Sequence, residues 1–223
     1  MHLYHGSENI IERPVFGKGK RYNDYGLGFY CTESVEMAKE WGVADDRDGY
    51  ANIYEFDNAG LSVLNLNKKS CIILQWLAIL LDNRTFTTQS VLALDAKRYI
   101  RENFLLDYQN YDVIVGYRAD DSYFSFAQDF LNGTISYRQL GNALRLGKLG
   151  EQVVLKSEKA FSSIRFIGAE EAPRDEWLSR KKNRDALALH AYFSGERLQR
   201  QKGDLYVTQI LDEEMKVDDP RLQ

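Results

Sequence analysis

The feature that most constrains the fold is an apolar segment, CIILQWLAILL, at residues 71–81. A helix needs about 20 apolar residues to cross a bilayer, so this shorter segment is expected to form a buried helix instead. The chain has 223 residues, 44% of them hydrophobic and 28% charged, which is sufficient for one substantial core. We therefore expect a globular protein with no membrane-spanning segment.

The charge and the cysteine content limit which classes of function and which cellular compartment we expect. The formal net charge is −4, which argues against a broadly basic nucleic-acid surface but leaves open nucleic acid as a modified substrate. Cys31 and Cys71 have neither the spacing of a metal site nor that of a disulfide framework. The first residues show no basic region followed by an apolar run, so no signal peptide is expected. We expect a cytoplasmic protein without a bound metal.

Apolar periodicity predicts strands and helices in mixed order, which is typical of an α+β fold. The helix that follows residue 34 is expected to have Thr32 or Ser34 as its N-cap. Strands are expected at residues 2–5, 29–32, 51–57, 61–66, 111–118, 152–157 and 164–168, and helices at 35–41, 70–82, 90–104, 122–131, 136–144 and 159–163.

The last quarter of the chain has a different composition. Residues 169–185 are dense in charge and predict a solvated linker or the start of a helix. Beyond them Ala186, Leu189 and Phe193 share one helical face, and residues 205–211 are expected to form a strand. We therefore expect a main domain at 1–168 and a helix-strand extension at 169–223 that packs on it.

Several short motifs occur in a specific order. The sequence has YHGS at 4–7, GLGFYCT at 26–32, Trp41 eleven residues after Tyr30, YDVIVGYRADD at 111–121 and EQVVLKSEKA at 151–160. Each motif alone is weak, because a histidine at a strand end or a tyrosine within a strand is usually structural. Their order and spacing together are more specific.

This set of motifs resembles the ADP-ribosyltransferase superfamily, in the branch whose triad is histidine, tyrosine and a variable third residue. It is similar to a little-characterised bacterial family of such domains, and the resemblance covers most of residues 2–168. The resemblance implies a split α+β body, with two packed antiparallel sheets, flanking helices and an NAD cleft. The pattern of the residues alone predicts only a mixed α+β fold.

The resemblance also implies roles for individual residues. His5 would bond the adenosine-side ribose of NAD, and Gly6 would offer its backbone to the nicotinamide carboxamide. Tyr30 would stack on the nicotinamide ring, with Trp41 as a second ring on the other side. Thr32 is expected to lie in the same NAD-binding site.

The third triad position is open between Glu151 and Gln152. Neighbouring strand residues point to opposite faces, and Gln152 shares with Lys156 the face that we expect to be wetter. That pattern and the resemblance favour Gln152. A glutamine brings no negative charge, and losing such a contribution costs on the order of 10²–10³ in rate. The pair Asp120 and Asp121 could compensate, although such a pair is commonly a solvated helix cap.

The sequence thus predicts an NAD-consuming enzyme that transfers ADP-ribose to a macromolecular acceptor, either protein or nucleic acid. The alternatives are an NAD glycohydrolase, an inactive NAD- or ADP-ribose-binding module, and an α+β domain acting only through protein contacts. Residues for a zinc site, a nucleophilic cysteine or a phosphate-binding glycine loop are not expected. The resemblance implies a bacterial toxin or defence effector with a neutralising antitoxin partner.

Overall fold

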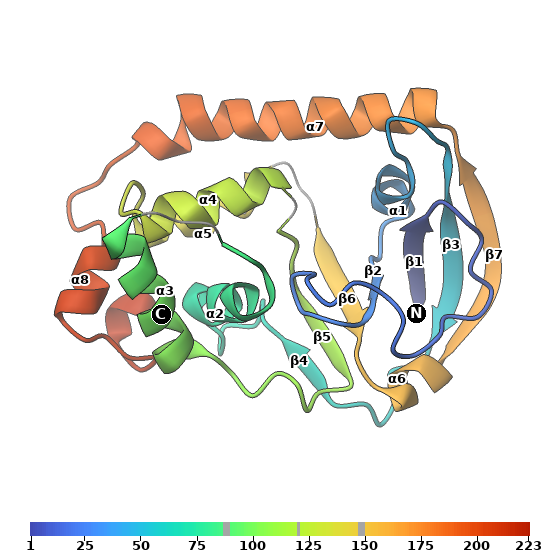
Figure 1. Ribbon diagram of the computed structural model, residues 1–223, viewed down its shortest axis with the longest axis horizontal. Helices are drawn as coiled ribbons and strands as arrows, with labels where there is room; N and C mark the ends of the chain where they lie inside the picture. The colour runs from blue at the N-terminus through green and yellow to red at the C-terminus, as the bar shows by residue number, and fades with distance from the viewer. Residues whose placement is uncertain (87–89, 120, 147–149) are drawn as a thin grey trace.

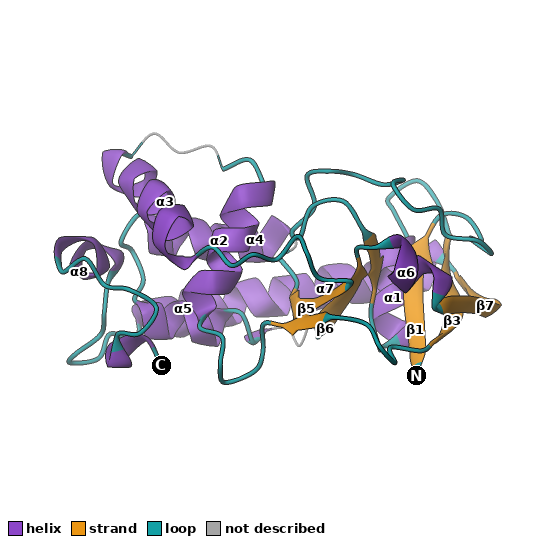
Figure 2. Ribbon diagram, turned by 90° about the horizontal axis from the view of Figure 1, so that it is seen from below, coloured by secondary structure: helices purple, strands orange, loops and turns teal. Residues whose placement is uncertain are grey.

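A computed structural model describes residues 1–86, 90–119, 121–146 and 150–223 of the protein. Strands gather at one end of the molecule and most helices at the other, with β5 and β6 between them (Figure 2). The expected α+β class is confirmed. Within the described ranges, no helix combines the length and the apolar character that crossing a membrane requires.

The first sheet is antiparallel and has three strands. Its order is β1 (His2–Ser7), β3 (Gly49–Phe56) and β7 (Ile164–Ala172). A bulge interrupts the β3–β7 pairing between Ile53 and Tyr54. The other edge of β1 faces the second sheet, so it marks the split between the two sheets.

The second sheet has four strands and is not purely antiparallel. Its order is β2 (Phe29–Cys31), β6 (Glu151–Leu155), β5 (Val113–Tyr117) and β4 (Val63–Asn65). Strands β4 and β5 are parallel, contrary to the expectation of two antiparallel sheets. Parallel neighbours need a long crossover, and the chain between β4 and β5 contains two helices.

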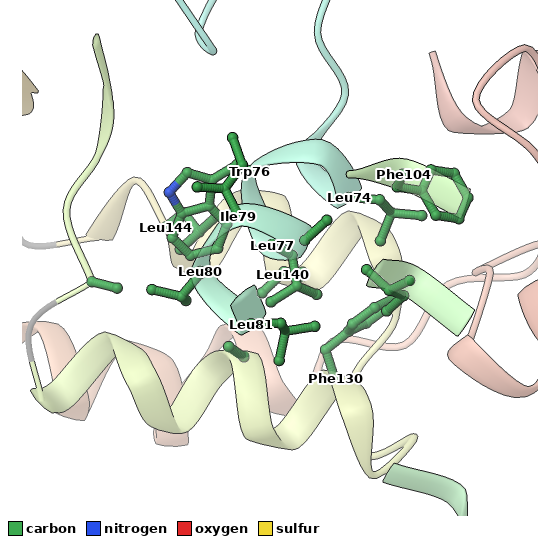
Figure 3. Packing of buried hydrophobic residues seen from close by; sticks show 14 of the residues in the cluster. Leu74, Trp76, Leu77, Ile79, Leu80, Leu81, Phe104, Phe130, Leu140 and Leu144 are labelled. Carbon is green, nitrogen blue, oxygen red and sulfur yellow. The ribbon is translucent and has the colours of Figure 1, made fainter. Parts of the chain in front are cut away.

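The apolar segment at 71–81 forms the centre of the larger core. It makes α2 (Ile73–Asn83), in which every residue from Leu74 to Leu81 is buried. Trp76 is only 1% exposed, and its indole Nε1 donates to the Tyr117 carbonyl at 3.2 Å. Leucine and phenylalanine side chains of the neighbouring helices surround α2 (Figure 3). The expected buried helix is confirmed.

Other helices cover α2 and the outer face of the second sheet. Each presents apolar side chains to the α2 core, and a separate smaller cluster fills the space between the two sheets. The helices of the α2 core are α3 (Val91–Phe104), α4 (Asp121–Leu131), α5 (Tyr137–Ala143) and α8 (Val207–Asp212).

Helix α1 (Val35–Gly42) packs on β1 and β3 and carries Trp41 in its last turn. Its N-cap is Ser34, whose hydroxyl accepts from the Met37 amide at 3.2 Å. Of the two expected caps, Ser34 is therefore confirmed, and Thr32 instead accepts from the Ser34 amide at 3.3 Å. Along the chain, the short helix α6 (Glu158–Ser162) connects β6 to β7.

The C-terminal segment differs from the expected helix-strand unit. Helix α7 (Arg174–Ser194) runs along the top of the molecule in Figure 1, from the end that holds the first sheet to the end that holds most helices. The expected boundary at 168/169 falls inside β7. The expected strand at 205–211 is wrong, because residues from Val207 onward form α8. Val207 and Ile210 of this helix are both fully buried. Their three-residue spacing places both on one helical face. Short 3-10 helices at Glu196–Leu198 and Pro220–Leu222 complete the chain.

Candidate functional site

A cavity of about 340 Å³ lies where β2, β6, α1 and α7 meet beside the end of β5. It combines two aromatic rings with charged groups of both signs. Its lining residues are Asn23, Asp24, Tyr30, Trp41, Arg84, Arg118, Ala119, Gln152, Lys181 and Asp185. Three of the residues expected from the sequence, Tyr30, Trp41 and Gln152, therefore meet in one place.

Strand register brings Tyr30 and Gln152 to the same face. Tyr30 pairs with Val154, two residues beyond Gln152, and paired or alternate residues of a sheet share a face. Gln152 is only 4% exposed, so its face is not the wetter one that the pattern favoured. Glu151 is exposed and is outside the described lining of the cavity. Gln152 is thus the residue of the two that faces the cavity.

The Tyr30 ring is fixed by its own hydroxyl. This group donates to the Gly26 carbonyl at 2.6 Å and accepts from the Tyr25 amide at 3.0 Å. Gly26 has φ +74°, a left-handed conformation that glycine adopts easily. Burial raises the pKa of Tyr30 well above its ordinary value, so the phenol keeps its proton at neutral pH. The turn before β2 therefore positions the ring.

Asp24 is a buried carboxylate that the sequence analysis missed. Its Oδ2 accepts from Gln152 Nε2 at 3.1 Å and from the Ala119 amide at 2.8 Å. Its Oδ1 lies 3.2 Å from Arg84 Nη1. The side chain is 6% exposed, and burial raises the pKa of Asp24 above its usual value. The only sequence signal was an acidic residue just before the glycine pair, which is ordinary turn composition.

Trp41 has a cation on one face of its ring. The guanidinium carbon of Arg118 lies 4.3 Å from the ring centroid, a distance typical of a cation–π contact. Among the described residues, the buried Nε1 of Trp41 has no hydrogen-bond partner, and neither has Gln152 Oε1. Buried polar atoms are nearly always satisfied, so both atoms are candidates for contact with a ligand.

His5 is tied to this site but lies outside the described lining of the cavity. Its Nδ1 is 2.7 Å from the Tyr30 carbonyl, and its ring stacks on Phe29 with centroids 4.3 Å apart. A carbonyl oxygen only accepts, so Nδ1 carries the proton and Nε2 is left as an acceptor. Burial lowers the pKa of His5, which keeps the ring neutral at physiological pH.

Gly6 lies where helix α1 crosses β1. A Cβ at this position would be 2.0 Å from the Ala38 carbonyl oxygen and 2.8 Å from Trp41 Cβ. Only glycine permits this approach, which sets the distance between the strand and the helix. The position of Trp41 therefore depends on Gly6.

The remaining expected residues contribute less to the cavity. Thr32 is 2% exposed, joins Tyr4 of β1 through a bridge, and is outside the described lining. Asp120 lies outside the described residues. Asp121 begins α4, and its side chain also lies outside what the structure describes. The carboxylate that contacts Gln152 is Asp24, from a loop distant in sequence.

A second cavity of about 460 Å³ lies on the other side of the Gly26–Gly28 turn. It is lined by Lys156, whose Nζ donates to the Tyr25 carbonyl at 2.5 Å and lies 5.9 Å from the Tyr108 ring. Burial lowers the pKa of Lys156 to about 8. This lysine therefore loses its charge at a lower pH than an exposed lysine does.

This shift predicts a pH dependence of folding stability. A lysine whose pKa is lower in the folded state binds more protons when unfolded, so stability should rise from about pH 8 to about pH 10.5. Urea unfolding at pH 7.5 and 9.5 measures the change for the protein and for Lys156→Met. The rise should be smaller in the variant. Equal rises in both proteins would contradict the assigned pKa.

The described residues contain no group of three or more histidine, cysteine, aspartate or glutamate side chains arranged to hold a metal ion. Cys31 is buried and Cys71 is half-buried, and both are free thiols. Burial raises the pKa of the Cys31 thiol well above its usual value. Cys31 is therefore a poor nucleophile.

The fold and the cavity define an α+β protein with two small sheets and a polar, aromatic-lined site at their split. The chain belongs to the family described as "Protein of unknown function (DUF3990)", whose model matches residues 1–166. None of the curated proteins matches the chain. None of the solved structures matches it either. The matched region holds most of the cavity lining, whereas Lys181 and Asp185 of α7 lie beyond it.

Proposed function

We propose that the protein is an NAD-dependent ADP-ribosyltransferase with its site in the cavity beside β2 and β6. One observation carries the proposal: Tyr30 and Gln152 converge on this cavity from paired strands, while His5 bonds to the Tyr30 carbonyl. The histidine, the tyrosine and the third residue of the resembled triad are thus linked through adjacent strands. The ADP-ribosyltransferase-like split fold is part of the same proposal.

The backbone of Gly6 supports a nicotinamide site. Tyr4 exchanges two backbone hydrogen bonds with Thr32 of the second sheet, at 2.8 and 2.9 Å. Alternate residues of a strand direct their N–H and C=O groups to the same side, so those of Gly6 also point toward the split. A carboxamide has one acceptor and two donor hydrogens, which match one N–H and one C=O. Neutral His5 would accept from a ribose hydroxyl through Nε2.

The aromatic residues suit a flat cationic ring. Nicotinamide in NAD is a pyridinium, and stacking on the Tyr30 face stabilises such a ring. Arg118 already covers one face of Trp41. A nicotinamide between Tyr30 and Trp41 therefore uses the opposite face of Trp41 or displaces this guanidinium. Arg84, Arg118 and Lys181 add positive charge to the lining, which suits the pyrophosphate of NAD.

The proposed reaction breaks the bond between the nicotinamide nitrogen and the ribose C1′. The bonding electron pair leaves with nicotinamide, which becomes neutral, and C1′ gains oxocarbenium character. A nucleophile on the macromolecular acceptor then bonds to C1′ and releases its proton. In NAD glycohydrolysis, water takes the place of the acceptor. A closed, positioned site favours bond breaking because it holds the leaving group and excludes stray water.

A second candidate is an inactive NAD- or ADP-ribose-binding module. It is favoured by Gln152, an amide at a position where a glutamate carboxylate is expected. Under either reading NAD occupies the same cavity. A bacterial toxin or defence role, with a neutralising antitoxin partner, is the biological setting that the resemblance implies.

Nicotinamide release from NAD by the purified protein tests the proposal. We expect release by the wild type, loss of about 10²-fold in Gln152→Ala, and near wild-type release in Glu151→Ala, which is exposed. The melting temperature with and without NAD is measured for all three proteins. A protein stabilised by NAD that releases no nicotinamide would favour the binding module. If the protein neither releases nicotinamide nor is stabilised by NAD, the proposed function is refuted.

A further inference from the structure

We propose that Asp24 and Gln152 act as one unit that takes the place of a single catalytic glutamate. In this unit Gln152 contacts the ribose hydroxyls, and Asp24 orients Gln152 and supplies the negative charge. The inference rests on the proposed function and assigns a role to a residue that the motif pattern does not include.

The hydrogen bonds of Asp24 fix the direction of the Gln152 amide. An ionised carboxylate only accepts, so the group that faces Asp24 Oδ2 at 3.1 Å must be the amide NH₂. The amide oxygen is then directed elsewhere. This Oε1 is buried and has no partner in the part of the chain that the structure describes. A ribose hydroxyl in the cavity would satisfy it by donating a hydrogen bond.

The surroundings of Asp24 act on its charge in opposite directions. Burial has the largest effect and raises the pKa of Asp24, whereas the hydrogen bonds from the Ala119 amide and Gln152 and the nearby Arg84 and Arg118 guanidinium groups counteract this rise and favour the ionised carboxylate. Asp24 itself lines the cavity with Tyr30. A hydrogen-bond donor that is paired with a carboxylate is also polarised, so the Gln152 oxygen becomes a stronger acceptor. Both effects favour positive charge at C1′.

The pairing also explains why a glutamate would be unfavourable at position 152 here. A carboxylate there would lie about as close to Asp24 as the amide now does, at 3.1 Å. Two carboxylates at such a distance cannot both ionise easily. This pair therefore consists of one carboxylate and one amide, and the charge is on Asp24, in the loop that precedes β2. Asp24 is a positioning residue in this scheme, because it orients Gln152 and contributes its charge without itself contacting the ribose.

Exchanging the two groups tests the unit. We expect Asp24→Asn to lower nicotinamide release by about 10²-fold or more, and the double variant Asp24→Asn/Gln152→Glu to recover about tenfold of that loss. A merely structural Asp24 would give no such recovery. Glu158→Gln, an exposed carboxylate of α6, is the matched control for loss of one charge. The double variant keeps one amide and one carboxylate in contact, so it stays informative if Asp24→Asn alone unfolds.

Binding separates failure of the unit from failure of the proposed function. Calorimetry compares NAD with an analogue that lacks the 2′-hydroxyl of the nicotinamide ribose. The wild type should bind NAD more tightly, and the difference should disappear in Gln152→Ala and shrink in Asp24→Asn. If NAD binds without turnover, the enzyme proposal fails, but this difference still decides on the unit. Wild-type release by Asp24→Asn, no recovery in the double variant, or an undiminished difference in Asp24→Asn would overturn the unit.

Discussion

Gly6→Ala is expected to destabilise the folded protein by about 3 kcal/mol and to displace Trp41 from the cavity. The added methyl group would lie 2.0 Å from the Ala38 carbonyl oxygen and 2.8 Å from the Gly42 amide nitrogen. Both are backbone atoms of α1, so no side-chain rotation can relieve the contact. The helix must move away from β1, and Trp41 moves with it. Urea unfolding measures the loss, and tryptophan fluorescence reports the displacement.

Gly168→Ala is the matched control for this variant. Gly168 lies in β7 of the same sheet, and a Cβ there would meet no atom within 4 Å. Its unfolding free energy should stay within about 0.5 kcal/mol of the wild type. Equal stability of Gly6→Ala and Gly168→Ala would show that α1 does not constrain Gly6. In that case only a ligand would require glycine at position 6.

The sequence predicted individual elements better than their arrangement. The apolar run at 71–81 predicted α2 because continuous apolar character over this length requires burial. Residues 205–211 were predicted as a strand, but the pattern of so short an apolar segment does not distinguish a strand from a buried helix. Burial of Val207 and Ile210 against the other helices decides for a helix there. The parallel β4–β5 pairing depends on where the helices between these strands pack, which local pattern does not contain.

The candidate site shows the same division. Strand alternation separated Gln152 from Glu151, and the motif order brought Tyr30 and Trp41 together. Asp24 and Arg84 come from a loop and a helix end, and a distance of 60 residues separates them along the chain. Lys181 comes from α7, in a segment that was predicted as a solvated linker or the start of a helix and not as part of a site. Such groups meet only through tertiary packing, so no local signal distinguishes them from ordinary surface charges.

Tyr30→Ala is expected to lower nicotinamide release by about 10²-fold, while Tyr30→Phe should stay within about tenfold of the wild type. Stacking contributes about 0.5–1.5 kcal/mol, and a cation–π contact adds about 1–2 kcal/mol. Their sum corresponds to about two decades in rate, because each 1.4 kcal/mol is about tenfold. Phenylalanine keeps the ring face and loses only the anchoring hydroxyl. Nicotinamide release, measured at saturating and at low NAD, separates binding from turnover.

The phenylalanine variant also has a predicted stability, which keeps the two roles of Tyr30 apart. Removing the hydroxyl removes both the donor to the Gly26 carbonyl and the acceptor of the Tyr25 amide, which costs about 1–3 kcal/mol. Tyr30→Phe should therefore be less stable but active, with its ring still in the cavity. If both variants lose activity equally, the hydroxyl and the turn matter more than the ring. Full release by Tyr30→Ala would show that nicotinamide does not bind against β2 in this cavity. Among the described residues, Tyr30 is the one side chain of β2 that lines the cavity.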